Sequence, residues 1–261
     1  MADMKQVLQV TGHALARAGV FVGSKVAQAV KAVDPDVYRH AVQVPLLSYS
    51  LLVSRHETIE AGKDDGHPPL IFVHGLGGNR GNFLLMAGYF RLMGRRRSYK
   101  IHFDPGQSMA DMAAALADFI TQVLAVTGAP QVEMVAHSLG GIVARMAITD
   151  HGLGGDTVKT LVTLGSPHRG TYAARFANTE TTRLLRPDSD FMKTLADTPL
   201  PAGVRTVCLF SHNDLLVIPG PMACLPGSRE VDVTPFTHYS YLLDPKSWSV
   251  VWQELGGASG S

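Results

Sequence analysis

The sequence predicts an α/β fold in which a mostly parallel, doubly wound sheet is flanked by helices. Short apolar runs typical of buried strands alternate with longer segments whose apolar residues recur at helical spacing. Several of these runs end in glycine, serine, histidine or aspartate. Because parallel strands bring their carboxyl ends to one edge of the sheet, such residues are expected to lie together there, where α/β proteins bind ligands.

Length and composition indicate one large domain. The chain has 261 residues, enough for a sizeable core, and no change in composition marks a second domain. We expect an N-terminal helical extension (1–40), a main domain (41–255) and a flexible tail (256–261). Lys and Arg total 23 against 22 Asp and Glu, which leaves a net charge of +1. Nucleic acid is therefore not an expected partner, and the oligomeric state cannot be read from the sequence.

The predicted compartment is the cytoplasm. No stretch reaches the 18 or so uninterrupted apolar residues of a membrane span, and the N-terminus lacks the compact apolar core and cleavage site of a secretory signal. Cys208 falls inside an apolar, strand-like run, so we expect it and Cys224 to be reduced thiols.

Residues 1–36 carry apolar positions at roughly helical spacing and end at Asp34-Pro35. Two interpretations stay open for this helix. In the first, it packs on the main domain; the sparse cationic face favours this one. In the second, it lies on a membrane surface as a peripheral contact. The run from Tyr49 to Val53 predicts an edge strand.

The next segments predict strand, helix, strand and helix in turn. Residues 69–73 form a buried-strand pattern followed by a glycine-rich loop, 74–79, which lacks the lysine and spacing of a nucleotide-binding loop. Helical spacing marks 82–92, a strand pattern marks 99–103, and an amphipathic helix covers 111–126 before Gly128. A basic run is interpreted as a solvated helix end and loop: Arg91, Arg95, Arg96, Arg97 and Lys100.

The central stretch of the chain joins a strand to a helix at a serine. The apolar run Val132–Ala136 leads through His137 to Ser138 and then, without a gap, into a helical pattern. A helix that doubles back over its strand requires small residues two positions before and after the corner, and Ala136 and Gly140 meet that need. Ser138 is therefore the predicted nucleophile. The backbone N–H groups of Leu139 and Leu76 are the predicted oxyanion donors.

The rest of the chain predicts strands at 158–164, 204–210 and 230–233 and a closing helix near 247–255. Periodicity weakens between 171 and 203, as expected of short helices laid over the active end of the sheet. We interpret this insertion as a small lid or acyl-site wall, with Tyr172, Phe176 and Phe191 as candidate substrate-binding residues. An ordinary packed connection is the alternative.

A serine hydroxyl needs a base to take its proton and a carboxylate to hold that base. Asp214 follows the strand 204–210 and His238 follows the last strand, so Ser138, Asp214 and His238 are the predicted catalytic residues. His212 and His168 are weaker alternatives for the base. The weaker alternatives for the acid are Asp188, Asp190, Asp232 and Asp244. His74 and His137 are expected to pack or to form hydrogen bonds, and no cofactor or metal is predicted.

Four motifs together resemble the bacterial serine lipases: His74-Gly75-Leu76-Gly77-Gly78, Thr127-Gly128-Ala129 leading into Ala136-His137-Ser138-Leu139-Gly140-Gly141, Val162-Thr163-Leu164-Gly165, and Asp214-Leu215-Leu216-Val217. The nearest likeness is to small triacylglycerol lipases whose elbow also begins with alanine, and it covers about 69–243. The resemblance implies an α/β-hydrolase fold and hydrolysis of lipid-like carboxylic esters.

The chain departs from those small lipases in two ways. They have essentially no lid, whereas the segment after 166–171 looks more like the larger, lidded bacterial lipases. They are also secreted, which this N-terminus does not suggest. The larger lipases often hold a structural calcium, but no ligands for one match here. Two other functions stay open: a thioesterase or acyltransferase with the same triad, and a non-catalytic lipid-binding relative.

Overall fold

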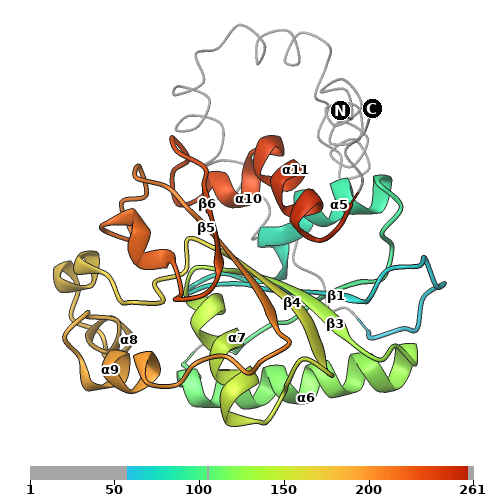
Figure 1. Cartoon of the computed structure of the whole chain (residues 1–261), viewed down its shortest axis with the longest axis horizontal. Helices are drawn as coiled ribbons and strands as arrows, with labels where there is room; N and C mark the ends of the chain where they lie inside the picture. The colour runs from blue at the N-terminus through green and yellow to red at the C-terminus, as the bar shows by residue number, and fades with distance from the viewer. Residues whose placement is uncertain (1–57, 105, 258–261) are drawn as a thin grey trace, which may run out of the picture.

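A computed structural model describes residues 58–104 and 106–257. They form a six-stranded sheet in which every strand pairs in parallel with its neighbours, in the order β2-β1-β3-β4-β5-β6. Helices cover both faces of the sheet (Figure 1). The predicted fold class is confirmed. The predicted N-terminal extension (1–40), the strand Tyr49–Val53 and the last four residues lie outside the described residues.

The central strands are buried on both faces, which explains their nearly continuous apolar sequences. Every residue of β1 and β3 is buried, although β3 includes Glu133. The edge strand β2 is shorter than the predicted 99–103, because it has a single neighbour and leaves the ladder after Lys100. The strands are β1 (Leu70–Val73), β2 (Ser98–Lys100), β3 (Val132–His137), β4 (Val158–Leu164), β5 (Arg205–Phe210) and β6 (Arg229–Asp232).

The helices form two layers with an apolar core on each side of the sheet (Figure 1). One layer holds α6 (Met109–Thr127) and α7 (Leu139–Asp150). The other holds α5 (Leu84–Leu92), α10 (Ser240–Leu243) and α11 (Pro245–Glu254). Two 3-10 turns, η2 (Arg80–Phe83) and η4 (Gly220–Ala223), lie in the connections. The one-turn helix α10 was not predicted, since four residues are too few to show a helical period.

The helix α6 illustrates how its sequence defines its ends. The Ser108 hydroxyl accepts from the Asp111 N–H at the start, and Gly128 takes the left-handed conformation that closes many helices. Length and composition alone would allow α6 to cross a membrane. In this fold Leu116, Ile120 and Val123 are fully buried in the core, as in a helix of a globular domain.

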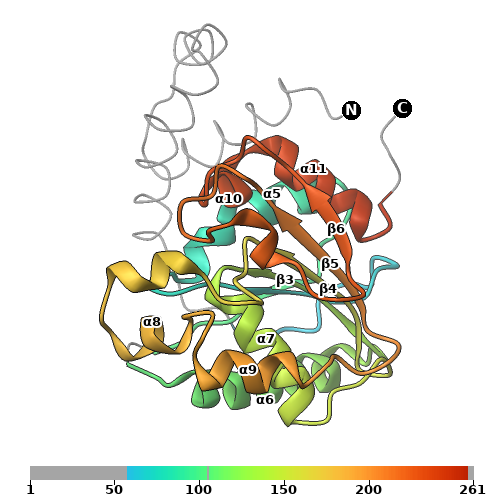
Figure 2. The same ribbon diagram turned by 60° about the vertical axis from the view of Figure 1, so that its left-hand side comes forward.

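The predicted insertion does consist of short helices: η3 (Tyr172–Phe176), α8 (Glu180–Leu184) and α9 (Asp190–Ala196). Its second half is fixed to the core, because Arg145 of α7 donates to the carbonyls of Leu195 in α9 and of Thr198 just after it. In the first half, no residue of α8 is buried. The two ends of this half are joined by a hydrogen bond from the N–H of Thr171 to the Leu185 carbonyl (2.9 Å). Figure 2 shows α8 projecting beside α9 at one end of the molecule.

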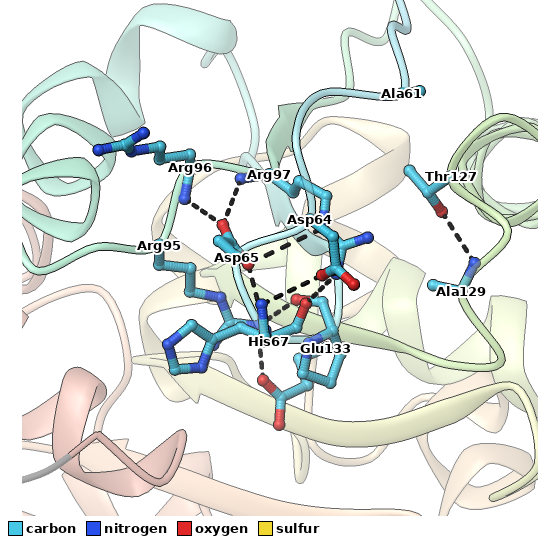
Figure 3. Close-up of polar contacts among 12 residues, drawn as sticks. Ala61, Asp64, Asp65, His67, Arg95, Arg96, Arg97, Thr127, Ala129 and Glu133 are labelled. Atoms are coloured by element: carbon cyan, nitrogen blue, oxygen red, sulfur yellow. Dashed lines mark hydrogen bonds and ion pairs between the residues drawn. The ribbon is translucent and has the colours of Figure 1, made fainter.

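The basic run lies at the amino edge of the sheet and is partly buried, so its interpretation as a solvated loop is wrong for two residues. The Arg95 guanidinium contacts the Glu133 carboxylate at 2.5 Å, with both side chains almost fully enclosed. Arg97 is also buried and pairs with Asp64 at 2.6 Å. Figure 3 shows these arginines beside the loop that carries Asp64 and Asp65. The acidic partners come from distant segments, so the run itself could not reveal them.

Candidate active site

Ser138 lies at a sharp corner between β3 and α7. Its backbone angles are φ 55° and ψ −127°, and it is the one non-glycine residue with positive φ within 58–104 and 106–257. A side chain held in this region costs about 1–3 kcal/mol, so the surroundings must enforce it. The Ser138 N–H donates to the Leu164 carbonyl of β4 at 2.9 Å. The corner therefore presents the serine at the carboxyl edge of the sheet, as predicted.

Two glycines allow the loop after β1 to press against this corner. A Cβ on Gly140 would lie 2.6 Å from the carbonyl oxygens of Val73 and His74. A Cβ on Gly75 would lie 2.8 Å from the Cβ of Ser138. Neither position has room for a side chain, which explains why small residues flank the nucleophile. Ala136 is buried in β3 two residues before it.

Asp214 and His238 form a buried pair on the loops after β5 and β6. The Nδ1 atom of His238 is 2.9 and 3.0 Å from the two carboxylate oxygens of Asp214. The same carboxylate accepts from the backbone N–H groups of Leu216 (2.8 Å) and Val217 (3.1 Å). Because an ionised carboxylate can only accept, Nδ1 carries the proton and Nε2 of His238 has its lone pair free to act as a base.

The nucleophile and the pair converge on the same edge. His137, the residue before Ser138, places its ring 4.6 Å from the His238 ring, centroid to centroid. Gly165, next to Leu164, lies against Asp214: a Cβ there would be 2.8 Å from a carboxylate oxygen. The described residues contain no hydrogen bond from the Ser138 hydroxyl to His238, so this last link of the triad is a proposal.

The two predicted oxyanion donors flank the corner. Leu139 is the first residue of α7, and the first N–H groups of a helix have no partner inside it. The carbonyl of Gly75 accepts from the N–H of Gly78 (3.1 Å) and from Nδ1 of His74 (3.0 Å). Since the N–H of a trans peptide points opposite to its C=O, the N–H of Leu76 points away from His74. Its role as a donor is part of the proposal below.

Comparison with solved structures identifies the fold. The crystal structure of the mature lipase BlEst2 from Bacillus licheniformis superposes with a TM-score of 0.63 and 20% identity, over 77% of this chain and 96% of that one. The chain has the α/β-hydrolase fold. Residues 65–194 match the family described as the PGAP1-like alpha/beta domain.

Two curated relatives carry the name triacylglycerol lipase. One from Pseudarthrobacter phenanthrenivorans is 28% identical over 116 residues, which is 41% of this chain and 35% of the relative. One from Burkholderia plantarii has the same identity over the same length and 32% coverage of its own chain. The chain thus aligns with about a third of the length of each relative.

The alternative acids and bases of this chain have other partners. His168 bonds to the Thr163 hydroxyl (3.1 Å), and the half-exposed His212 lies 3.8 Å from Asp232. Asp188 and Asp190 pair with Arg175 and Lys193 on the exposed part of the insertion. Asp244 accepts from the Lys246 N–H at the start of α11. Of the predicted candidates, the structure brings Asp214 and His238 together.

Three buried histidines are held neutral at this end of the molecule. Burial lowers the pKa of His74 to about 4 and the pKa of His168 to about 3, where the Arg145 charge adds to the effect. Burial and the neighbouring His238 lower the pKa of His137 well below its usual value. The prediction that His74 and His137 pack or form hydrogen bonds is confirmed.

Tyr241 is a site residue that the sequence reasoning missed. It is fully buried beside Gly165, where an added Cβ would lie 2.5 Å from its ring. Burial and the charge of Asp214 raise the pKa of the Tyr241 hydroxyl, so it stays neutral next to the carboxylate. In the sequence, Tyr241 could have been noticed only as an aromatic residue three positions after His238. It lies on α10, which is too short to be detected by its period.

Exposed apolar side chains lie on the loops that leave the carboxyl ends of β1, β4, β5 and β6. We call this set the apolar rim: Leu76, Tyr172, Phe176, Leu215, Leu216, Ile218 and Tyr239. Phe176 is 91% exposed and Leu215 is 75% exposed. The predicted substrate-binding residues Tyr172 and Phe176 belong to the rim. Phe191 instead packs partly buried against the core from α9, and its contact with substrate stays a prediction.

Both cysteines are buried thiols in the described part of the chain. Cys208 and Cys224 are free and buried, as predicted. Burial and the nearby Cys208 raise the pKa of the Cys224 thiol to about 12, which makes it a poor nucleophile. Within 58–104 and 106–257, no three His, Cys, Asp or Glu side chains are grouped so that they could hold a metal ion.

Proposed function

We propose that this α/β-hydrolase cleaves carboxylic esters of lipid-like acyl substrates through an acyl-enzyme intermediate. One observation supports this above all. Ser138 occupies a strained strand-to-helix corner at the same edge of the sheet as the buried Asp214–His238 pair. This is the set of groups that acyl transfer to a serine requires.

In the proposed reaction, Nε2 of His238 takes the Ser138 proton as Oγ attacks the ester carbonyl. Asp214 stabilises the resulting imidazolium, and the N–H groups of Leu76 and Leu139 hold the oxyanion. The intermediate collapses, the C–O bond to the alcohol breaks, and His238 protonates the departing alcohol. Water then attacks the acyl carbonyl with His238 again as base, which releases the acid and restores the Ser138 hydroxyl.

The substrate class is supported by the apolar rim and by the relatives named triacylglycerol lipases. Exposed Leu, Phe and Tyr side chains around the site favour an acyl chain over a charged or sugar-like group. A series of p-nitrophenyl esters from acetyl to long acyl chains tests this proposal. Turnover should rise as the chain lengthens beyond acetyl, and strict preference for acetyl would contradict a lipid-like substrate.

The two other functions are less favoured. A thioesterase or acyltransferase would use the same triad, but the named relatives are lipases. Comparing p-nitrophenyl esters, acyl-CoA and added alcohol acceptors separates these reactions. A non-catalytic lipid-binding protein would not need the serine, histidine and carboxylate that are all present here.

The nucleophile can be tested by a fluorophosphonate probe with intact-mass detection. We expect one adduct on the wild type, none on Ser138→Ala, and loss of ester turnover by several orders of magnitude in that variant. Ser166→Ala is the matched control. Ser166 is a fully buried serine just after β4 whose hydroxyl has no hydrogen-bond partner among the described residues, so this variant should label like the wild type. An adduct that persists on Ser138→Ala would exclude Ser138 as the nucleophile.

A further inference from the structure

We propose that His137 is a positioning residue that aligns the base His238 with the nucleophile. This role rests on the function proposed above. The Nε2 atom of His137 lies 2.9 Å from the main-chain carbonyl oxygen of His238, across 101 positions of sequence. A carbonyl oxygen can only accept, so Nε2 of His137 donates the hydrogen. The residue next to the nucleophile is thereby bonded to the main chain of the base.

His137 makes this bond from a fully enclosed position. Its side chain is 3% exposed, and its other ring nitrogen has no hydrogen-bond partner in the described part of the chain. Desolvation opposes a charge on the ring, and so does the neighbouring His238, which becomes cationic during the proposed reaction. His137 therefore stays a neutral donor throughout the cycle. It neither competes for the Ser138 proton nor repels the imidazolium with a charge of its own.

The bond adds a second anchor to His238. Asp214 holds the ring through Nδ1, and His137 holds the backbone through the carbonyl. With ring and main chain both fixed, Nε2 of His238 has one orientation relative to Ser138. A shift of about 1 Å in such an arrangement lowers turnover by about 100-fold, because the proton transfer requires close alignment.

The test compares three variants of His137 with a matched control. Gln places an amide N–H near the position of Nε2, Asn is one methylene shorter, and Leu fills the space without a donor. His168→Gln and His168→Leu are the controls. His168 is equally buried, makes a single ring hydrogen bond to Thr163, leaves Nδ1 without a partner and lies at the same edge of the sheet, without bonding to His238.

We would measure kcat and KM on p-nitrophenyl butyrate, the rate of fluorophosphonate labelling, and Tm. The expected kcat of His137→Leu and His137→Asn is lower by about 10- to 100-fold, with KM within about threefold of the wild type. Labelling should slow in parallel. His137→Gln should recover kcat to within about threefold. The His168 variants should keep wild-type kcat even where Tm falls.

Three results would overturn the positioning role: wild-type kcat in His137→Leu and His137→Asn, equal losses in His137→Gln and His137→Asn, or an equal loss of kcat in His168→Leu. If His137→Leu does not fold, the comparison of Gln with Asn decides. Failure of the proposed function has a different signature, because the wild type itself would then neither label at Ser138 nor hydrolyse the ester, and the role of His137 would fall with it.

Discussion

The positive φ of Ser138 persists because the residues around the corner leave no alternative. Gly140 of α7 packs directly against the carbonyls of Val73 and His74. Relaxing the corner would move α7 away from β1 and would lose this close packing. Strained backbone conformations of this kind occur where function needs them and where the neighbouring structure enforces them. At the residue scale, the position of Ser138, the proposed nucleophile, thus depends on the lack of a side chain at Gly140.

Gly140→Ala should therefore reduce both stability and activity. The new Cβ would meet two backbone oxygens at 2.6 Å, and backbone cannot rotate away as a side chain can. We expect a loss of about 1–3 kcal/mol in the free energy of unfolding, as for other overpacked sites, together with reduced ester turnover. Urea unfolding and kcat measurements check this expectation.

Gly88→Ala supplies the control for that substitution. Gly88 lies inside α5, and an added Cβ meets nothing within 4 Å. Alanine there should be neutral or should stabilise the protein by about 0.5–1 kcal/mol, because glycine is a poor helix former. If both variants change stability alike, close packing at Gly140 is not the cause.

The placement of individual residues was predictable from the sequence to different degrees. Asp214 and His238 could be expected to lie together, because each follows a strand of the same sheet. Their order along the chain is the one that the proposed chemistry needs. Tyr241 and the buried Arg95 could not be assigned. Their environments depend on Gly165, Asp214 and Glu133, and a one-dimensional pattern does not show which distant side chains will enclose a residue.

At the scale of elements, patterns longer than one turn were reliable. The strand Val158–Leu164 and the helix that follows Ser138 match their predictions, because a buried strand shows a continuous apolar run and a helix shows apolar residues at helical spacing. The edge strand β2 and the one-turn helix α10 were shorter than such patterns can resolve. The insertion was predicted as short helices, but its attachment to α7 depends on Arg145, whose carbonyl partners carry no sequence signal.

The Arg95–Glu133 pair connects the β1–β2 region to β3 at the edge opposite the site. Glu133→Gln would leave the buried guanidinium of Arg95 without its counter-charge. We expect a loss of about 3–5 kcal/mol, the usual cost of breaking a buried pair from one side. Activity per folded molecule should be unchanged, since Glu133 lies at the amino end of β3. Urea unfolding and kcat on the same samples separate the two effects.

Two further variants make that expectation specific. Arg95→Met combined with Glu133→Leu removes both charges and should recover much of the stability, because a well-packed apolar pair can replace a buried ion pair. Asp190→Asn breaks the exposed pair with Lys193 and should leave the unfolding midpoint unchanged. A loss for Asp190→Asn as large as that for Glu133→Gln would show that burial is not what makes the Arg95 pair important.

At the scale of the whole molecule, the carboxyl edge of the sheet concentrates polar groups that must stay uncharged. His74, His137 and His168 are buried and neutral there, while the apolar rim lies exposed on the loops at the same edge. Each neutral histidine suits the proposed reaction, in which His238 is the one base. It also makes the fold sensitive to acid, because the unfolded chain can protonate these histidines and the folded chain cannot.

The sign of this effect follows from the depressed pKa values. An exposed histidine in the unfolded chain takes up a proton as the pH falls through about 6.5, whereas folded His74 and His168 do so only near pH 4 and pH 3. Stability is therefore fully present above pH 6.5 and declines below it. The slope approaches about 1.4 kcal/mol per pH unit for each histidine, which amounts to about 2 kcal/mol each between pH 6.5 and 4.5.

His168→Gln isolates one part of that decline. It removes a titrating group while keeping an amide that can bond to the Thr163 hydroxyl, so its unfolding free energy should fall by about 2 kcal/mol less than that of the wild type between pH 6.5 and 4.5. Urea unfolding at intervals across that range measures both curves, and stopping at pH 4.5 limits protonation of carboxylates. Parallel curves for the two proteins would mean that folded His168 accepts a proton as readily as an exposed histidine, which its enclosure between Thr163 and Arg145 should prevent.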